Sequence, residues 1–146
     1  MILTPEQVKK YGHYFPDHVE KYVVDAFFND YKPPINIPIT KDEYKESVRK
    51  WEKYNIELPQ TALINDRGRE YEQSGNISAA INEYENNVGL DKYPAPFAYD
   101  RLMVLYRRLK DYCNEIRILN IAIQVFPKDI KYKQRLEKVQ KLINNK

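Results

Sequence analysis

Apolar side chains recur at the spacing of an α-helix along most of this chain. In residues 17–30 they fall three or four positions apart and form one stripe, made by Val19, Tyr22, Val23, Ala26 and Phe27. Residues 130–143 show the same spacing, with an inner stripe made by Leu136, Val139, Leu142 and Ile143. Both segments are therefore predicted to be amphipathic helices.

A further helix is expected at the start of the chain. Thr4 is a good capping residue, Pro5 suits a first helical turn, and Gln7 can reach back to the cap as in a capping box. Gly12 interrupts the pattern and Pro16 follows it. This helix should be short.

Three prolines separate the helix at residues 17–30 from the next one. They prevent residues 32–39 from being helical, so we expect an extended connector whose isoleucines lie against a neighbouring surface. Thr40 with Glu43 repeats the capping-box signal. A helix is predicted from there to about Tyr54, ending within residues 55–59.

From Thr61 onward the chain repeats itself with a shift of 35 residues. The shift aligns six positions of two successive units: Gly68 with Met103, Tyr71 with Tyr106, Ile77 with Tyr112, Ile81 with Ile116, Tyr84 with Leu119, and Val88 with Ile123. Each unit has the pattern of two helices. The first pair turns at residues 74–76, where Gly75 or Asn76 can adopt a left-handed conformation. The second pair turns at residues 109–111.

This repeat resembles the tetratricopeptide repeat, a helical hairpin of about 34 residues with a sparse signature. The first unit carries that signature at Gly68, Tyr71, Ala80 and Tyr84, and the second keeps Leu102, Tyr106, Leu119, Ala122 and Pro127. The form of the second unit is similar to repeats found in many small bacterial and phage-borne proteins. The resemblance covers residues 61–146 and implies a scaffold that binds other proteins, without naming a partner.

The second unit departs from the signature at two positions. Met103 stands where a small residue is usual, and Glu115 stands where alanine is usual. Both positions lie where the two helices of such a hairpin approach most closely. Either this hairpin is splayed or Glu115 has a polar partner.

The predicted fold class is all-α: a tetratricopeptide-like hairpin array with a helical N-terminal extension and a C-terminal capping helix. Two hairpins are fewer than the three that usually form a stable stack. We therefore expect residues 1–60 to pack on the array formed by residues 61–146, in one continuous domain. Self-association through the same face is the alternative, so the chain is expected to be a monomer or a homodimer.

Composition sets outer limits on this interpretation. A length of 146 residues suits a single core, and no apolar run approaches the roughly 20 residues needed to cross a membrane. Residues 1–10 show no secretory signal pattern, and a single cysteine excludes an internal disulfide. We expect a cytoplasmic protein with no membrane partner.

Charge is unevenly distributed along the chain. Residues 101–146 hold 12 Lys and Arg against 4 Asp and Glu, a balance of +8, whereas residues 1–100 have a balance of −5. A basic end can attract an acidic protein, nucleic acid or a second copy of the chain. The residues that would bind nucleic acid are Arg107, Arg108, Arg117, Lys128, Lys131, Lys133, Arg135, Lys138 and Lys141.

No catalytic residues, cofactor or metal site are predicted. His13 and His18 are five residues apart across a proline, which is poor spacing for a shared metal ion. Cys113, at the start of a predicted helix, is expected to be a small half-buried residue. No glycine-rich phosphate loop or nucleophile elbow is present. We expect a binding protein and not an enzyme.

The resemblance implies a concave face lined by the first helix of each hairpin. On or near it we place seven candidate partner-binding residues: Asn65, Arg69, Glu72, Asp100, Arg101, Val104 and Arg108. Asn65, Arg69 and Arg101 are partly similar to the clamp with which some family members hold a terminal carboxylate. Alternatively, the arginines pair with Glu72 and Asp100 as surface ion pairs of little energetic value.

The leading hypothesis is an adaptor or regulator that binds another protein through this groove or through its tyrosine-rich N-terminal surface. Nucleic-acid or acidic-partner binding through the basic C-terminal half is a second hypothesis. A third is a small inhibitor or immunity-type protein of a mobile element that blocks another protein.

Overall fold

The computed structural model describes residues 1–28 and 33–145 of the chain, and these residues form an all-α fold with one very short strand pair. The chain divides into two compact units, Met1–Glu57 and Leu58–Lys146, called here the N-terminal unit and the hairpin unit. Each is described by itself. The prediction that they form one continuous domain stays a prediction.

The N-terminal unit begins with strand β1 (Ile2–Leu3) and helix α1 (Pro5–Tyr11). Thr4 and Gln7 form the predicted capping box, and α1 ends at Gly12, as expected. An added Cβ at Gly12 would lie 2.7 Å from Val23 Cγ1, so the glycine allows a close approach of two segments.

A pair of short 3₁₀ turns, η1 (Gly12–Tyr14) and η2 (Asp17–Val19), leads to helix α2 (Glu20–Phe28). Only part of the predicted apolar stripe is inside: Val23 is buried, whereas Tyr22 and Phe27 are 41% and 56% exposed. The end of the predicted helix, at residue 30, lies outside the described residues.

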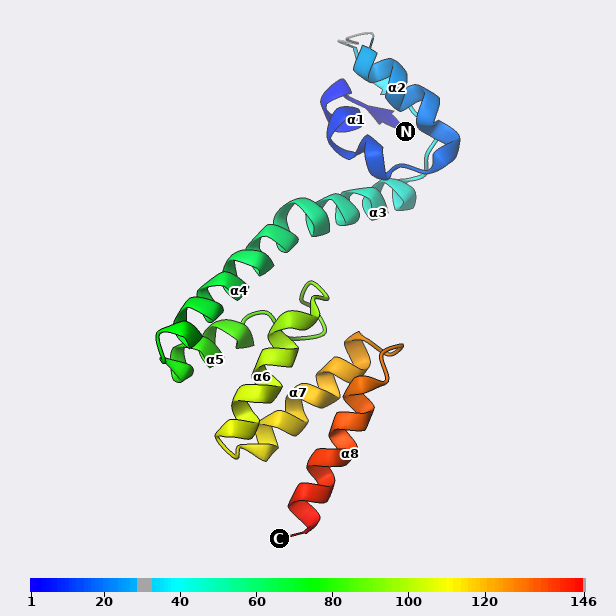
Figure 1. The fold of residues 1–146 in the computed structure, drawn as a ribbon. Coiled ribbons are helices and arrows are strands. Elements are labelled where there is room, and N and C mark those ends of the chain that lie inside the picture. The colour runs from blue at the N-terminus through cyan, green and yellow to red at the C-terminus, as the bar shows by residue number, and fades with distance from the viewer. Residues whose placement is uncertain (29–32, 146) are drawn as a thin grey trace. The chain divides into compact units, whose positions relative to one another are not determined.

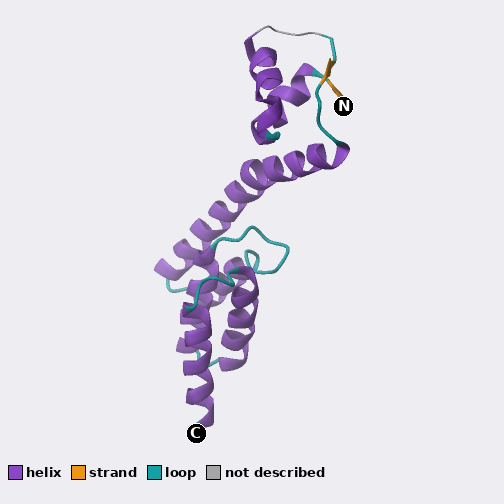
Figure 2. Ribbon diagram, turned by 90° about the vertical axis from the view of Figure 1, so that its right-hand side faces the viewer, coloured by secondary structure: helices purple, strands orange, loops and turns teal. Residues whose placement is uncertain are grey.

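The described part of the proline-rich connector, residues 33–39, is extended, as predicted. Ile35–Asn36 forms strand β2, which pairs antiparallel with β1 (Figure 2). Ile37 and Ile39 are buried in the core of this unit, which confirms that the isoleucines lie against a neighbouring surface. The sequence pattern did not predict the strand pair, because strands of two residues are too short to show alternation.

Helix α3 (Lys41–Glu52) starts at the predicted capping box of Thr40 and Glu43. The prediction that it ends within residues 55–59 is wrong. A π-helical turn, η3 (Lys53–Glu57), follows α3 directly, and α4 (Leu58–Gln73) follows η3 with no non-helical residue between them. Pro59 is the second residue of α4 and lies inside this continuous helical run, where it has no N–H to donate to the preceding turn.

The hairpin unit consists of α4 and four further helices, which Figure 1 shows in green to red. Their bounds are α5 (Ile77–Glu85), α6 (Pro96–Arg108), α7 (Tyr112–Val125) and α8 (Lys131–Asn144). Each helix packs on the next one along the chain. The predicted turns are present: Gly75 has a φ of +81°, and Lys110 has a φ of 57°.

Two of the repeated position pairs lie in the core of the hairpin unit. Gly68 on α4 lies so close to Tyr84 on α5 that an added Cβ would be 2.3 Å from the Tyr84 ring. At the equivalent positions of the second hairpin, Met103 and Leu119 are both buried. The tetratricopeptide-like repeat arrangement stays a prediction.

Helix α8 covers one side of the hairpins, with Tyr132 and Val139 buried. The predicted inner stripe is shorter than expected, since Leu142 and Ile143 are 43% and 40% exposed. These two residues lie in the last turn of α8, beyond the reach of the core cluster.

Candidate functional site

All seven predicted partner-binding residues lie on two helices of the hairpin unit. Helix α4 carries Asn65, Arg69 and Glu72, and helix α6 carries Asp100, Arg101, Val104 and Arg108. The structure gives these side chains different surroundings, which separate structural residues from those available to a partner.

Glu72 joins α4, α5 and α6. Its carboxylate accepts a hydrogen bond from Arg101 Nε at 3.1 Å and another from the Tyr84 hydroxyl at 2.5 Å. Burial alone would raise the pKa of Glu72, but the hydrogen bonds from Arg101 and Tyr84 outweigh it and lower that pKa. Burial, together with the bond to Glu72, raises the pKa of Tyr84. Arg101 is therefore engaged within the chain.

Arg69 and Arg108 are the exposed cations of this face. The Arg69 guanidinium lies 4.5 Å from the centre of the Phe97 ring and 3.5 Å from Asp66. Its ion pair is thus with Asp66 and not with Glu72 or Asp100. Arg108 helps to lower the pKa of Glu72, so it also lies within electrostatic reach of that carboxylate.

Asn65 is a structural residue. It is only 8% exposed, and its Oδ1 accepts a hydrogen bond from Asn87 Nδ2 at 2.8 Å. The same Asn87 amide donates to the Thr61 carbonyl at 2.9 Å. The placement of Asn65 on a partner-contacting surface therefore does not hold, because the side chain of Asn65 is buried and bonded to Asn87.

Asp100 and Val104 continue the face toward α8. Asp100 accepts hydrogen bonds from the Tyr132 hydroxyl at 3.0 Å and from Lys131 Nζ at 3.3 Å. Burial, followed by the nearby Asp100 carboxylate, raises the pKa of Tyr132. These contacts tie α8 to α6.

At three places in the hairpin unit, a carboxylate accepts hydrogen bonds both from a tyrosine hydroxyl and from an Arg or Lys side chain. Two have just been given, centred on Glu72 and on Asp100. In the third, Glu85 on α5 accepts hydrogen bonds from Tyr106 on α6 and from Arg117 on α7. We call each a tyrosine–carboxylate–cation triple. The triples explain part of the high tyrosine content, since these hydroxyls bond carboxylates within the chain.

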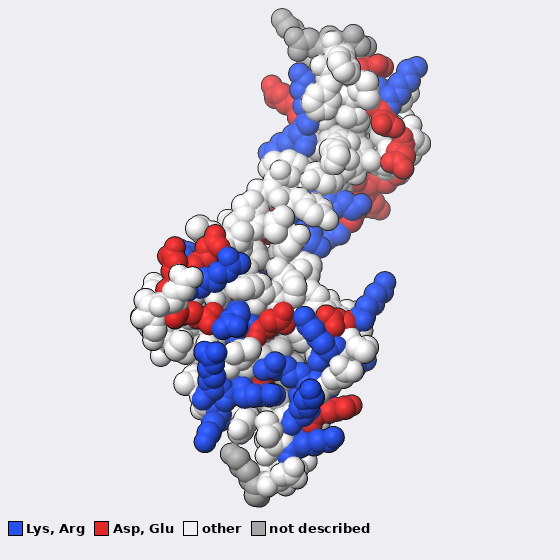
Figure 3. All heavy atoms as spheres, in the orientation of Figure 1, with Lys and Arg blue, Asp and Glu red and all other residues white. Residues whose placement is uncertain are grey.

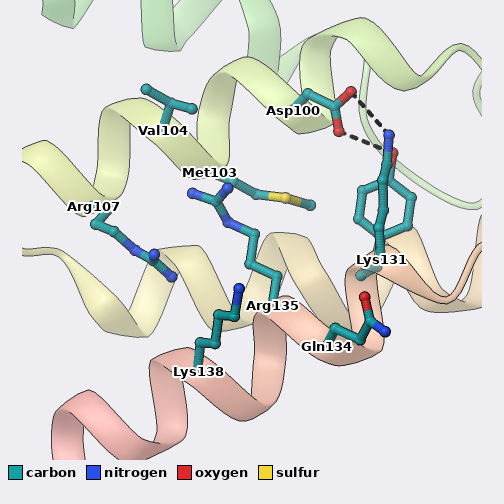
Figure 4. A pocket seen from close by; sticks show the side chains of 9 residues that line it. Asp100, Met103, Val104, Arg107, Lys131, Gln134, Arg135 and Lys138 are labelled. Atoms are coloured by element: carbon teal, nitrogen blue, oxygen red, sulfur yellow. Dashed lines mark hydrogen bonds and ion pairs between the residues drawn. The ribbon is translucent and has the colours of Figure 1, made fainter.

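A pocket of about 400 Å³ lies between α6 and α8 (Figure 4). It is lined by Asp100, Met103, Val104, Arg107, Lys131, Tyr132, Gln134, Arg135 and Lys138. Arg107 comes from α6, Arg135 and Lys138 come from α8, and all three side chains point into the space between these helices. Its volume is in the range of small-ligand sites, roughly 300–1,000 Å³.

Two buried nitrogen atoms of this pocket have no hydrogen-bond partner among the described residues: Arg107 Nη2 and Arg135 Nε. The Nε of Arg107 is satisfied, since it donates to the buried Glu115 at 2.8 Å. Burial, and then the positive charge of Arg107, lower the pKa of Arg135. The pocket therefore presents unused donors in a positive field.

Sequence reasoning did not identify this pocket, although it named four of its cations in the nucleic-acid alternative: Arg107, Lys131, Arg135 and Lys138. Two signals were available. Lys131, Arg135 and Lys138 are spaced four and three residues apart, which puts them on one helix face. Glu115, at an alanine position, indicated a buried cation nearby.

The remaining chemistry-bearing groups are isolated. Cys113 is exposed and not half-buried as predicted, because it lies in the first turn of α7 on the side away from the core. His18 Nε2 lies 3.1 Å from the Pro38 carbonyl oxygen, and His13 packs edge-on against Tyr14. Within residues 1–28 and 33–145, no group of three or more His, Cys, Asp or Glu side chains could hold a metal ion.

Two general properties complete the description of the chain. In the described part, none of the helices is both long and apolar enough to cross a membrane. Comparisons with protein-family models, with curated proteins and with solved structures find no match for this chain.

Proposed function

We propose that this chain is a protein-binding module, an adaptor or regulator of the cytoplasm, and that it binds its partner through one face of the hairpin unit. That face, called here the α4–α6–α8 face, comprises the exposed parts of these three helices. The chain performs no catalysis in this proposal and needs no cofactor.

The observation that carries the proposal is the row of polar contacts that links the three helices. Glu72 and Arg101 join α4 to α6, and Asp100 with Lys131 joins α6 to α8. The Glu72–Arg101 pair holds α4 and α6 together, and Arg108 stays exposed and Val104 half-exposed beside it. A pre-arranged surface on α4 and α6 loses little entropy on association, which favours binding.

A pair of matched variants tests this proposal. Val104→Asp with Arg108→Glu alters the face, whereas Lys92→Glu with Asn120→Asp makes comparable charge changes elsewhere on the hairpin unit. Affinity capture from the native cell, quantified by mass spectrometry, should lose specific proteins with the face variant and keep them with the control. Circular dichroism must show unchanged helix content in both. Equal capture by both variants contradicts the proposal.

The distribution of charge supports nucleic-acid binding as a second candidate. Figure 3 shows Lys and Arg gathered over the part of the hairpin unit formed by α6, α7 and α8. Binding to phosphates by such a surface weakens steeply as salt rises. The absence of any shift of RNA or DNA in a gel at about 50 mM salt, where such binding is strong, would remove this candidate.

A further inference from the structure

The pocket between α6 and α8 is more basic than its neighbours can neutralise. Four cations line it: Arg107, Lys131, Arg135 and Lys138. Three carboxylates pair with two of these cations: Asp100 and Asp129 with Lys131, and Glu115 with Arg107.

The other two cations, Arg135 and Lys138, both lie on α8. Among the described residues, neither Arg135 nor Lys138 forms an ion pair. A ligand that pairs with both of these cations would carry two negative charges.

The unused donors indicate the shape of that ligand. Arg107 Nη2 and Arg135 Nε are buried without a partner, and Lys138 points into the same space from the next turn of α8 (Figure 4). Three donors from different directions suit a group with three acceptor oxygens. A carboxylate has two oxygens and one charge, whereas a phosphate monoester has three oxygens and nearly two charges at neutral pH.

We infer that this pocket binds the dianionic phosphate of a phosphomonoester, carried by a phosphorylated side chain of the partner protein. Arg107 and Arg135 donate to its oxygens, and Lys138 supplies charge at the rim. Met103 and Val104 form the apolar wall beside them. The inference that a protein carries the phosphate rests on the proposed function; the pocket's preference for a phosphate dianion does not.

A nucleic-acid backbone is a poorer fit to the same groups. Each phosphodiester carries one negative charge and has only two free oxygens. Such a ligand would leave one of the two cations of α8 without compensation. Oligonucleotide binding is therefore an outcome of the test and not part of the inference.

The first experiment is an NMR titration of the full chain with inorganic phosphate at pH 7.5 and constant ionic strength. Saturable shifts are expected for amides of residues 103–107 on α6 and 131–138 on α8. Lys138→Gln and Arg135→Gln should each weaken binding about tenfold, the effect of losing one charge-assisted hydrogen bond. Lys133→Gln removes the same charge from an exposed position of α8 outside the pocket and should leave the affinity unchanged.

Lys138 is exposed, so its substitution keeps the test valid if Arg135→Gln impairs folding. Absence of saturable shifts, or equal loss of affinity in Lys133→Gln and Lys138→Gln, overturns the inference. Acetate at the same ionic strength is the charge control. If acetate binds as tightly as phosphate, the preference for a dianion is refuted.

A competition experiment identifies the source of the phosphate. O-phosphoserine should displace inorganic phosphate from the same amides, and an oligothymidine should not do so at an equal concentration of phosphate groups. Displacement by the oligothymidine alone overturns the inference in favour of nucleic acid. If phosphate binds but the face variant captures the same proteins as the control, only the proposed function is contradicted. The proposed function and the phosphate preference of the pocket can therefore fail separately.

Discussion

Arg107 and Glu115 form an ion pair whose carboxylate is completely buried. Arg107 Nε lies 2.8 Å and 3.2 Å from the two oxygens of Glu115. The first hairpin has Ala80 at the position equivalent to Glu115. The second hairpin therefore has a buried ion pair where the first has a small apolar side chain. Of the two alternatives that the sequence left open, a splayed hairpin or a polar partner for Glu115, the structure shows the second.

Arg107→Ala should destabilise the hairpin unit strongly. It leaves the Glu115 carboxylate buried without a partner, and breaking a buried pair from one side costs about 3–5 kcal/mol. Because Arg107 is itself one-third exposed, we expect the lower end, about 3 kcal/mol, in chemical denaturation. Arg108→Ala, at the exposed neighbouring position, should change the free energy of unfolding by no more than about 0.5 kcal/mol.

The double variant Arg107→Ala with Glu115→Ala gives the decisive comparison. It removes both charges, so it should be less destabilised than Arg107→Ala alone. If the double variant loses as much free energy of unfolding as the two single variants together, the residues do not interact as described.

Gly68→Ala should destabilise the first hairpin although alanine is the better helix former. The propensity gain is at most about 1 kcal/mol. The new Cβ would lie 2.3 Å from a ring atom of Tyr84, which is fully buried and cannot move away. Overpacking of this kind costs about 1–3 kcal/mol, so we expect a net loss and a lower Tm in thermal unfolding.

The second hairpin indicates how to relieve that clash. It has Met103 and Leu119 at the positions of Gly68 and Tyr84. Tyr84→Leu removes the ring and should recover part of the stability lost in Gly68→Ala. A double variant as unstable as the sum of both changes would show that the ring is not the cause.

The pH dependence of stability should report on Glu72. Its folded pKa is below the ordinary value of 4.5, because Arg101 and Tyr84 favour the charged form despite burial. The resulting stabilisation is complete above the unfolded pKa and is lost as pH falls through the lower folded pKa. In denaturation series at pH 7, 4 and 3, Glu72→Gln should therefore be less stable than the wild type at pH 7, and the difference should shrink toward pH 3. Glu70→Gln, at an exposed position of the same helix, is the matched control and should have little effect on stability at pH 7.

Asn87→Ala should destabilise the hairpin unit through the group it leaves behind. Buried Asn65 Oδ1 would lose the hydrogen bond from Asn87 Nδ2. An unsatisfied buried acceptor costs about 1–3 kcal/mol, so we expect a loss in that range in urea denaturation. Asn82→Ala, an exposed asparagine on α5, is the matched control and should have little effect.

Much of the helical order follows from local signals. The capping boxes at Thr4 and Thr40 and the turn at Gly75 each depend on neighbouring residues, so the sequence predicts them directly. The helical junction before Pro59 was missed. Its π-helical turn has no composition signal that distinguishes it from a helix end.

The candidate site was only partly predictable, because it depends on pairings between helices. Periodicity placed Asp100 and Arg101 on one helix but not their partners, which lie 31 and 29 residues away in sequence. Asn65 was placed on the surface because nothing near it in sequence reveals Asn87 as a buried donor. The pocket needed α6 and α8 side by side before its cations formed one site.

The tyrosine–carboxylate–cation triples have a consequence for the order in which the hairpin unit opens. The pair of Lys131 with Asp100 holds α8 and is the most hydrated of the three, with side chains 51% and 42% exposed against 31% and 15% for Arg101 and Glu72. In an array where each helix is held by its neighbours, fraying begins at the weakest step. Amide protons of α8 should therefore exchange with solvent earliest. A ligand bound between α6 and α8 would slow the amide exchange of α8. Its binding could therefore be detected as a change in the backbone dynamics of α8, far from α4.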